Sequence, residues 1–320
     1  MNIEEIATFI NSTFFGNKNY KITGVASVNN PSENAIVLVS KKKYITDDVI
    51  HKSGAILTSP GFVNFFPRNN LVISDNLEKD FARICSLFVN YSSIPISSMD
   101  KEKKHQIHIG KNVSYGENFN YGCNVVIEDN VNIGNDVTFA HNVIICKDVK
   151  IGNNVVIGPG TIIGSEGFGN IFDDKKWHHI PHLGSVEIFN NISIGANCTI
   201  DRGTIDDTII KDGAIIDNQV HIAHNVLIGE DTAIAANVGI AGSTSIGKRN
   251  MIGGMVGIVD HINTTDDVII SATSTVFTDI KEPGVYTGIM PIFKHTTWKR
   301  IAFWISKLDK IAKVFKLKES

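Results

Sequence analysis

The chain has 320 residues, enough for roughly two or three structural units with a sizeable core, and its net charge of −3 does not mark the whole surface for nucleic acid. No apolar run reaches the length of a membrane span, and residues 1–6 are acidic where a secretory signal would be basic, so we expect a cytoplasmic protein. The cysteines lack CxxC spacing, and we expect reduced, packed thiols at Cys85, Cys123, Cys146 and Cys198.

Residues 1–100 show the mixture of helical and strand-like patterns that is typical of a small α/β domain. Apolar residues recur at helical spacing from Ile3 to Ile10 and from Phe81 to Phe88. Between these stretches, short apolar runs predict strands at 21–26, 35–39, 55–57 and 71–73. The polar stretch from Ser92 to Gln106 is expected to be a linker.

From Ile109 to Gly164 the sequence repeats every six residues. An aliphatic or aromatic residue begins each hexad, and a second apolar residue usually follows four positions later. The period resumes at Ile188, shifts its phase by four residues after Ile200, and continues from Ile210 to Val276. A hexapeptide period is typical of a parallel β-helix, in which three hexads form a coil of 18 residues and residues 18 apart stack at strand spacing. We therefore predict a β-helix over residues 101–280, a scaffold that can also be purely structural.

An excursion at residues 165–186 interrupts the β-helix pattern. It is rich in glycine, aromatic residues and histidine, and binding groups tend to lie on such loops of a rigid scaffold. Its His178, His179 and His182 could suggest a metal, but zinc needs three or four converging ligands and the spacing does not guarantee convergence. We therefore expect no metal.

Residues 281–320 begin with a turn and continue as a basic helical stretch from about Lys294 to Leu317. Its cations are Lys294, Lys299, Arg300, Lys307, Lys310, Lys313 and Lys316. Three interpretations are open: a solvated helix face, electrostatic docking of an acidic protein partner, and contact with a membrane surface.

His224 is the strongest candidate for chemistry. It occupies the third position of its hexad, so it should project outward near a corner of the coil. An imidazole there can accept a proton at neutral pH, and Asp217, seven residues earlier, could hydrogen-bond the ring. Gly242 lies 18 residues further on, where its backbone N–H could stabilise an oxyanion. The alternative is a solvated turn histidine, because residues 140–143 repeat the same Ala-His-Asn-Val in the same phase.

His261 lies 37 residues after His224, which is two coils plus one position along the β-helix. It could line the same groove as His224 and contact a donor or acceptor group. Packing at the irregular step around Val259 and Asp260 is an equally good interpretation of its spacing.

Five ordered segments are specific enough to indicate a family. They are GSEGFG at 164–169, TIDRG at 199–203, DNQVHIAHNV at 217–226, AGST at 241–244 and EPGVY at 282–286. With these segments the chain resembles, over essentially its full length, the UDP-3-O-(3-hydroxyacyl)glucosamine N-acyltransferases of the lipid A pathway. This family lies within the wider superfamily of hexapeptide acyltransferases.

The resemblance implies a mainly β protein whose centre is a left-handed parallel β-helix of hexapeptide repeats. A small N-terminal α/β domain (1–100) would bind the uridine nucleotide, residues 101–280 would form the acyltransferase domain, and 281–320 a C-terminal helical extension. Three copies would form a homotrimer with active sites in the grooves between adjacent prisms.

The resemblance also implies a reaction and its residues. A 3-hydroxyacyl group would pass from acyl carrier protein to the 2-amine of UDP-3-O-(3-hydroxyacyl)glucosamine. His224 would be the general base, Gly242 the oxyanion donor, and His261 would help to position the acyl donor.

Three further residues in the shared segments are expected to bind substrate, namely Asn218, Gln219 and Phe168. No cofactor is implied, because the phosphopantetheine arm of the carrier protein holds the acyl group. The carrier protein is acidic, which gives the basic helix a partner. We expect no nucleic acid and at most peripheral membrane contact.

The sequence departs from the family pattern in three places. In the segment that stacks uracil, Leu38 replaces a phenylalanine and Lys41 an asparagine, so Tyr44 would stack alone. The excursion reads His-Ile-Pro-His at 179–182 where the family usually has Lys-Ile-Pro-Gln. Residues 271–275, expected along the acyl channel, are small, which predicts acceptance of a longer chain.

Two other functions are compatible with the sequence. The first is an acyl-CoA-dependent acyltransferase for a small sugar, which would share the β-helix and a histidine base. The second is a repurposed, non-catalytic paralogue that binds a nucleotide sugar, for which the changes at Leu38 and Lys41 leave room.

Overall fold

The structure is a computed structural model that describes residues 1–88, 107–289 and 291–315. The chain divides into two compact units, Met1–Ser93 and Ile94–Ser320. The predicted linker at Ser92–Gln106 lies outside the described residues. Of the helices described, none is both long and apolar enough to cross a membrane.

The N-terminal unit is a sheet with helices on both faces and the strand order β1-β5-β4-β3-β2. Its strands are β1 (Thr13–Phe15), β2 (Gly24–Ala26), β3 (Ala35–Val39), β4 (Ala55–Thr58) and β5 (Leu71–Ile73). Its helices are α1 (Ile3–Ile10), α2 (Asp47–Lys52) and α3 (Leu77–Ser86), with short 3-10 helices η1 (Lys42–Tyr44) and η2 (Pro60–Phe65).

Both predicted helices and the four predicted strands of this unit are present. The sequence did not indicate β1 or α2, because three residues are too few to show strand alternation and six too few to show a helical stripe.

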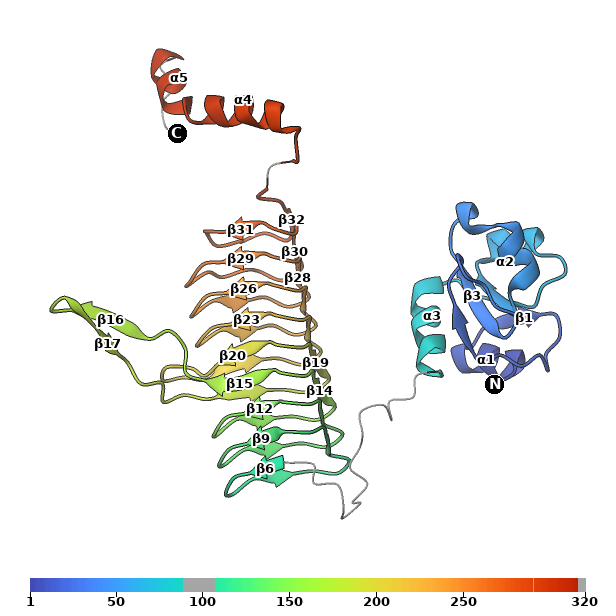
Figure 1. Cartoon of the computed structure of the whole chain (residues 1–320), viewed down its shortest axis with the longest axis horizontal. Helices are drawn as coiled ribbons and strands as arrows, with labels where there is room; N and C mark the ends of the chain where they lie inside the picture. The colour runs from blue at the N-terminus through green and yellow to red at the C-terminus, as the bar shows by residue number, and fades with distance from the viewer. Residues whose placement is uncertain (89–106, 290, 316–320) are drawn as a thin grey trace. The chain divides into compact units, whose positions relative to one another are not determined.

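Within the described residues, the hexads form three parallel sheets that are the faces of a β-helix (Figure 1). The first sheet contains β6 (Ile107–Ile109), β9 (Val125–Ile127), β12 (Ile144–Ile145), β15 (Ile162–Ser165), β20 (Thr199–Asp201), β23 (His221–Ile222), β26 (Gly239–Ile240), β29 (Gly257–Ile258) and β31 (Thr275–Val276). The second contains β8 (Asn120–Tyr121), β11 (Thr138–Phe139), β14 (Val155–Ile157), β19 (Ile192–Ile194), β22 (Ile215–Ile216), β25 (Ala233–Ile234), β28 (Met251–Ile252), β30 (Val268–Ile270) and β32 (Gly284–Tyr286). The third contains β7 (Ser114–Tyr115), β10 (Asn132–Ile133), β13 (Lys150–Ile151), β18 (Val186–Ile188), β21 (Thr208–Ile210), β24 (Leu227–Ile228) and β27 (Ser245–Ile246).

The register of these strands confirms the predicted 18-residue coil. Ile133 pairs with Ile151, and Ile228 pairs with Ile246. The first and second apolar positions of successive hexads point inward and form one continuous buried core. Each coil therefore buries little by itself and depends on its neighbours above and below.

The turns between hexads are occupied by residues in the left-handed conformation. Asn112, Asn130 and Asp148 have φ between 56° and 67°, and asparagine and aspartate tolerate this region better than most residues. Their side chains also join successive coils, because Asn112 donates to Asn130 (3.1 Å) and Asn130 donates to Asp148 (3.0 Å).

Two interruptions break the 18-residue spacing. Ile151 pairs with Ile188, 37 residues away, because the excursion lies between them. The excursion contains an antiparallel hairpin of β16 (Asn170–Asp173) and β17 (Lys176–His179), visible beside the stacked coils in Figure 1. Ile188 then pairs with Ile210, 22 residues away, so four extra residues form a loop at 203–207. After β32 the chain continues as α4 (His295–Ile305) and α5 (Leu308–Phe315).

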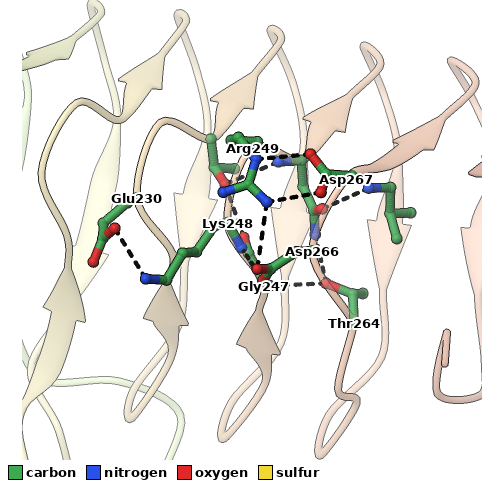
Figure 2. A network of polar contacts seen from close by, with 10 residues as sticks. Glu230, Gly247, Lys248, Arg249, Thr264, Asp266 and Asp267 are labelled. Carbon is green, nitrogen blue, oxygen red and sulfur yellow. Dashed lines mark hydrogen bonds and ion pairs between the residues drawn. The ribbon is translucent and has the colours of Figure 1, made fainter. Parts of the chain in front are cut away.

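A polar network runs through one corner of the later coils (Figure 2). Asn250 is fully buried at a position where most hexads have valine or another apolar residue. Its amide donates to the Thr264 hydroxyl (2.7 Å) and accepts the N–H of Val268 (2.8 Å), while its own N–H donates to Thr232 (3.2 Å). On the outside of the same corner, Arg249 pairs with Asp267 (2.7 Å) in full contact with solvent.

We expect the buried amide to matter more for stability than the exposed ion pair. Asn250→Ala leaves the N–H of Val268 buried without an acceptor, which costs about 1–3 kcal/mol. The thermal midpoint should therefore fall clearly in this variant. Asn263→Ala, whose side chain is exposed one coil further on, is the control and should leave the midpoint nearly unchanged. Equal shifts in the two variants would contradict the structural role of Asn250.

Candidate active site

A groove of about 630 Å³ opens on the outer face of the first sheet, where β23, β26, β29 and β31 lie side by side (Figure 1). Its floor is formed by residues in register, which are His221, Gly239, Gly257 and Thr275. The two glycines leave the floor bare, and a methyl group added at Gly239 would meet no atom within 4 Å.

Four of the residues singled out in the sequence line this groove, namely His224, Gly242, His261 and Phe168. Asp217, Asn218 and Gln219 lie instead at the turn that leads into β23, and Tyr44 belongs to the N-terminal unit. Of residues 271–275, only Thr275 lines this groove, whereas Ser271 and Ala272 line a shallow groove on the second sheet.

The half-buried ring of His224 is held between two glycines. A methyl group added at Gly242 would lie 2.6 Å from its Cε1 and 2.7 Å from its Nε2. One added at Gly167 would lie 3.2 Å from its Cδ2. Only glycine therefore lets the backbone approach the ring this closely on both sides.

His141 and His224 occupy the same hexad position but do different things. At this position a side chain usually accepts the backbone N–H of the preceding coil, and His141 does so with its Nδ1 and the N–H of Cys123 (2.8 Å). The corresponding N–H for His224 is that of Arg202, which donates to the carbonyl of Ser165 instead (2.8 Å). The ring of His224 is therefore released from capping, whereas His141 is a structural turn histidine.

The tautomer of His224 follows from its neighbour Asn225. The Thr204 N–H donates to Oδ1 of Asn225 (3.0 Å), and Nδ2 of Asn225 donates to the carbonyl of Asp206 (2.8 Å). Because a backbone N–H only donates and a carbonyl only accepts, the orientation of this amide is determined. Its oxygen lies 3.1 Å from Nδ1 of His224, so Nδ1 carries the proton and the neutral ring keeps its lone pair on Nε2.

Asp217 does not hold the ring within the chain, contrary to the expectation from the sequence. Its carboxylate accepts the backbone N–H (2.7 Å) and the side-chain amide (2.8 Å) of Asn218. Residues seven apart lie at different corners of a triangular coil, whereas Thr204 and Asn225 lie at the same corner of successive coils. The hydrogen bond to Nδ1 therefore comes from Asn225.

Gly242 presents an unpaired backbone N–H at the edge of the groove. At the same hexad position, Lys248 donates its N–H to Asp266 (2.8 Å). Asp260 would be the equivalent acceptor for Gly242, but its carboxylate lies against His261 (3.9 Å). Among the described residues, no group accepts the Gly242 N–H.

The structure adds Asp201, a residue to which the sequence assigned no role. Its carboxylate is buried beside the groove, 3.2 Å from the Ser165 hydroxyl and 3.7 Å from Nε2 of His221. Burial raises the pKa of this carboxyl above its usual value, although His221, Ser165, His224 and His182 act in the opposite direction. Asp201 lies within a segment on which the family resemblance rests, which was the one sequence signal for it.

His261 and Phe168 border the groove from opposite directions along the chain. The N–H of His261 donates to the carbonyl of Gly242 (3.0 Å), which fixes the two residues in successive coils. Phe168 is highly exposed and belongs to the excursion. The groove is therefore lined both by the scaffold and by the loop that leaves it.

In the N-terminal unit, Tyr44 ends η1 and lies under a cation, with Nζ of Lys43 5.1 Å from its ring centroid. Lys42 lies over the ring of Phe65 at 5.9 Å. Leu38 packs against the core of this unit.

The sequence matches a family model described as bacterial transferase hexapeptide (six repeats) at residues 124–165 and 207–242. The chain is similar to UDP-3-O-acylglucosamine N-acyltransferases. It is 51% identical to that of Idiomarina loihiensis over 154 residues, which cover 48% of this chain and 45% of the relative. It is 41% identical to that of Hahella chejuensis over 154 residues, which cover 48% and 44%. The matches thus span less than half of each relative.

Solved structures share the fold. The UDP-N-acetylglucosamine O-acyltransferase of Moraxella catarrhalis superimposes with a TM-score of 0.52 and 25% identity, over 67% of this chain and 86% of that one. The UDP-N-acetylglucosamine acyltransferase of Francisella novicida gives a TM-score of 0.51 and 23% identity, over 66% and 77%. The chain is therefore a hexapeptide-repeat β-helix protein, similar in sequence to UDP-3-O-acylglucosamine N-acyltransferases and similar in fold to UDP-N-acetylglucosamine O-acyltransferases.

Proposed function

We propose that this protein is an N-acyltransferase of lipid A biosynthesis. It transfers a 3-hydroxyacyl group from acyl carrier protein to the 2-amine of UDP-3-O-(3-hydroxyacyl)glucosamine. The observation that carries this proposal is the His224 ring, whose Nε2 lone pair lies at a groove beside the unpaired N–H of Gly242. The names of the relatives favour this acceptor.

The geometry suits acyl transfer to an amine. The 2-amine attacks the thioester carbonyl carbon, and Nε2 of His224 takes the proton that the nitrogen loses. The carbonyl oxygen becomes negative and accepts the N–H of Gly242. The C–S bond then breaks, the sulfur takes the proton from His224, and an amide and the free carrier thiol are released. No bound cofactor is needed, because the thioester arrives already activated on the carrier.

The bare floor of the groove fits an acyl chain. Gly239 and Gly257 form a trough along the sheet, and the outward side chain of Thr275 follows in the same column. Apolar burial there would hold the chain, with His261 near the point where the donor enters. We place Asn218 and Gln219 toward the acceptor only if a neighbouring copy brings its own turn to the groove.

Other surfaces support the remaining parts of the proposal. The second sheet exposes an apolar column of Ile215, Met251 and Ile269, which suits the interface of a homotrimer. The basic residues of α4 and α5 complement an acidic carrier protein. Tyr44 would stack on uracil with its free face, and neighbouring lysines would meet the diphosphate.

The first test is turnover of UDP-3-O-(3-hydroxyacyl)glucosamine with a panel of 3-hydroxyacyl carrier-protein thioesters, read by mass spectrometry. We expect a second acyl chain on the amine, and a loss of about 10²–10⁴-fold in rate for His224→Ala. His141→Ala is a matched control, since it lies in the same tetrapeptide and should affect stability alone. Equal rates with acyl-CoA would indicate the CoA-dependent enzyme, and sugar binding without turnover would indicate the non-catalytic protein.

Asn225→Ala should lower kcat by roughly tenfold to a hundredfold, because the ring of His224 loses the acceptor that fixes its tautomer. Asn225→Asp keeps an oxygen toward Nδ1 and should retain more activity. Asn142→Ala removes the equivalent asparagine beside His141 and should leave kcat unchanged. Equal kcat values for Asn225→Ala and Asn142→Ala would argue against this role.

Gly239→Leu should shorten the acyl chain that the enzyme accepts, because the added side chain fills the trough without meeting other atoms. The rate ratio between long and short donors is the measurement, and we expect it to fall by about tenfold or more, the effect of losing a few buried methylenes. A folding defect would lower all rates alike, so an unchanged ratio would place the acyl chain elsewhere.

A further inference from the structure

His182 packs directly against the candidate base. It is 3% exposed, and its ring centroid lies 5.3 Å from that of His224 with the planes at 76°. Gly169 lies so close to Cε1 of His182 that no side chain fits there. A second imidazole is therefore built into the wall behind His224, outside the groove that would hold the substrates.

Only one nitrogen of His182 has a partner. Its Nδ1 lies 3.0 Å from the carbonyl oxygen of Ile180, which can only accept, so Nδ1 carries a proton in every state of the ring. Nε2 is buried, and no described residue hydrogen-bonds to it. The neutral ring leaves a lone pair there, whereas the charged ring would leave an N–H without an acceptor, which is the costlier arrangement.

Several titratable and charged groups surround this ring. On the excursion, Glu166 accepts from Nε2 of His179 (2.7 Å) and from the backbone N–H of His182, and the His179 ring lies parallel to that of His182 at 6.3 Å. On the coils, the groups are His224, Asp201 with His221, and Arg202, which donates to the carbonyl of Gly184 and pairs with Asp148.

The charge of His182 must affect His224 at this separation. His224 becomes an imidazolium when it takes the proton of the attacking amine, and like charges about 5 Å apart in a partly buried site repel strongly. A neutral His182 instead offers the cation a polarisable ring, while Asp201 supplies the negative charge.

We propose that His182 is a positioning residue for the acyl transfer, which supports the His224 imidazolium as a neutral ring and switches the base off when it gains a proton. This inference rests on the proposed function of His224. It predicts that two rings must be neutral for activity, so that the site loses activity more steeply in mild acid than one histidine alone would cause.

The test is the pH dependence of kcat/KM for the full-length protein and for His182→Gln, which keeps a neutral polar side chain of similar length. On the acid side we expect the slope of log kcat/KM against pH to approach two in the unmodified protein and one in the variant. At the alkaline plateau the two should agree within about tenfold. His178→Gln, on the exposed strand β17, is the control and should keep the slope of two. Superimposable slopes, or a rate lowered by the same factor at every pH, would overturn the proposal.

A second readout does not depend on turnover. In protein labelled with ¹³C at histidine Cε1, the His224 signal, assigned with His224→Gln, should titrate in two steps. In His182→Gln it should titrate in one step. A single step in the unmodified protein would overturn the coupling even if the variant failed to fold. Absence of turnover together with a two-step titration would contradict the acyltransferase function and leave the coupling established.

Discussion

The backbone hydrogen bonds between successive coils are the interaction on which the rest of this β-helix depends. They pair strands 18 residues apart, and the turn side chains add further bonds across the same step, as from Cys123 to His141. In a regular coil this pattern leaves little freedom, because outward turn groups are already committed to the coil below. A functional group can therefore arise only where the stacking is relaxed.

The two interruptions relax it at one place, and they hold each other. The N–H of Leu183 donates to the carbonyl of Thr204 (2.8 Å), and that of Gly184 to Gly203 (3.0 Å), so the end of the excursion is tied to the four-residue loop. Gly203 lies too close to the carbonyl of Asp206 for any side chain. Buried Arg202 closes the joint through the carbonyl of Gly184 (2.7 Å). The irregular segment is thus fixed by its own hydrogen bonds, and His224 above it is both uncapped and well ordered.

The period alone was enough to predict the β-helix, because each inward position recurs with the spacing that the coil imposes. The functional role of His224 could be suggested from its motif, but its difference from His141 could not, since both stand in Ala-His-Asn-Val. That difference depends on Thr204, which comes from the inserted loop and reaches Asn225 only after the coils have stacked. The expectation for Asp217 was wrong because closeness in sequence within a coil means separation around its perimeter. Buried Asp201 and His182 were equally hidden, since their importance lies in what surrounds them.

The same rigidity explains how so few groups can suffice for the proposed chemistry. An amine and a thioester need a base, an oxyanion donor and correct placement, and none of these requires a moving part. His224 and Gly242 stand in successive coils whose separation is set by the ladder, and the N–H of Ser243 donates to the carbonyl of His224 (3.0 Å) between them. The N–H of Gly242 is therefore oriented before any substrate arrives, so its dipole need not reorganise when the oxyanion forms. Stabilisation of this kind is strongest where the donor has no competing partner, which is the condition that Asp260 creates by turning toward His261.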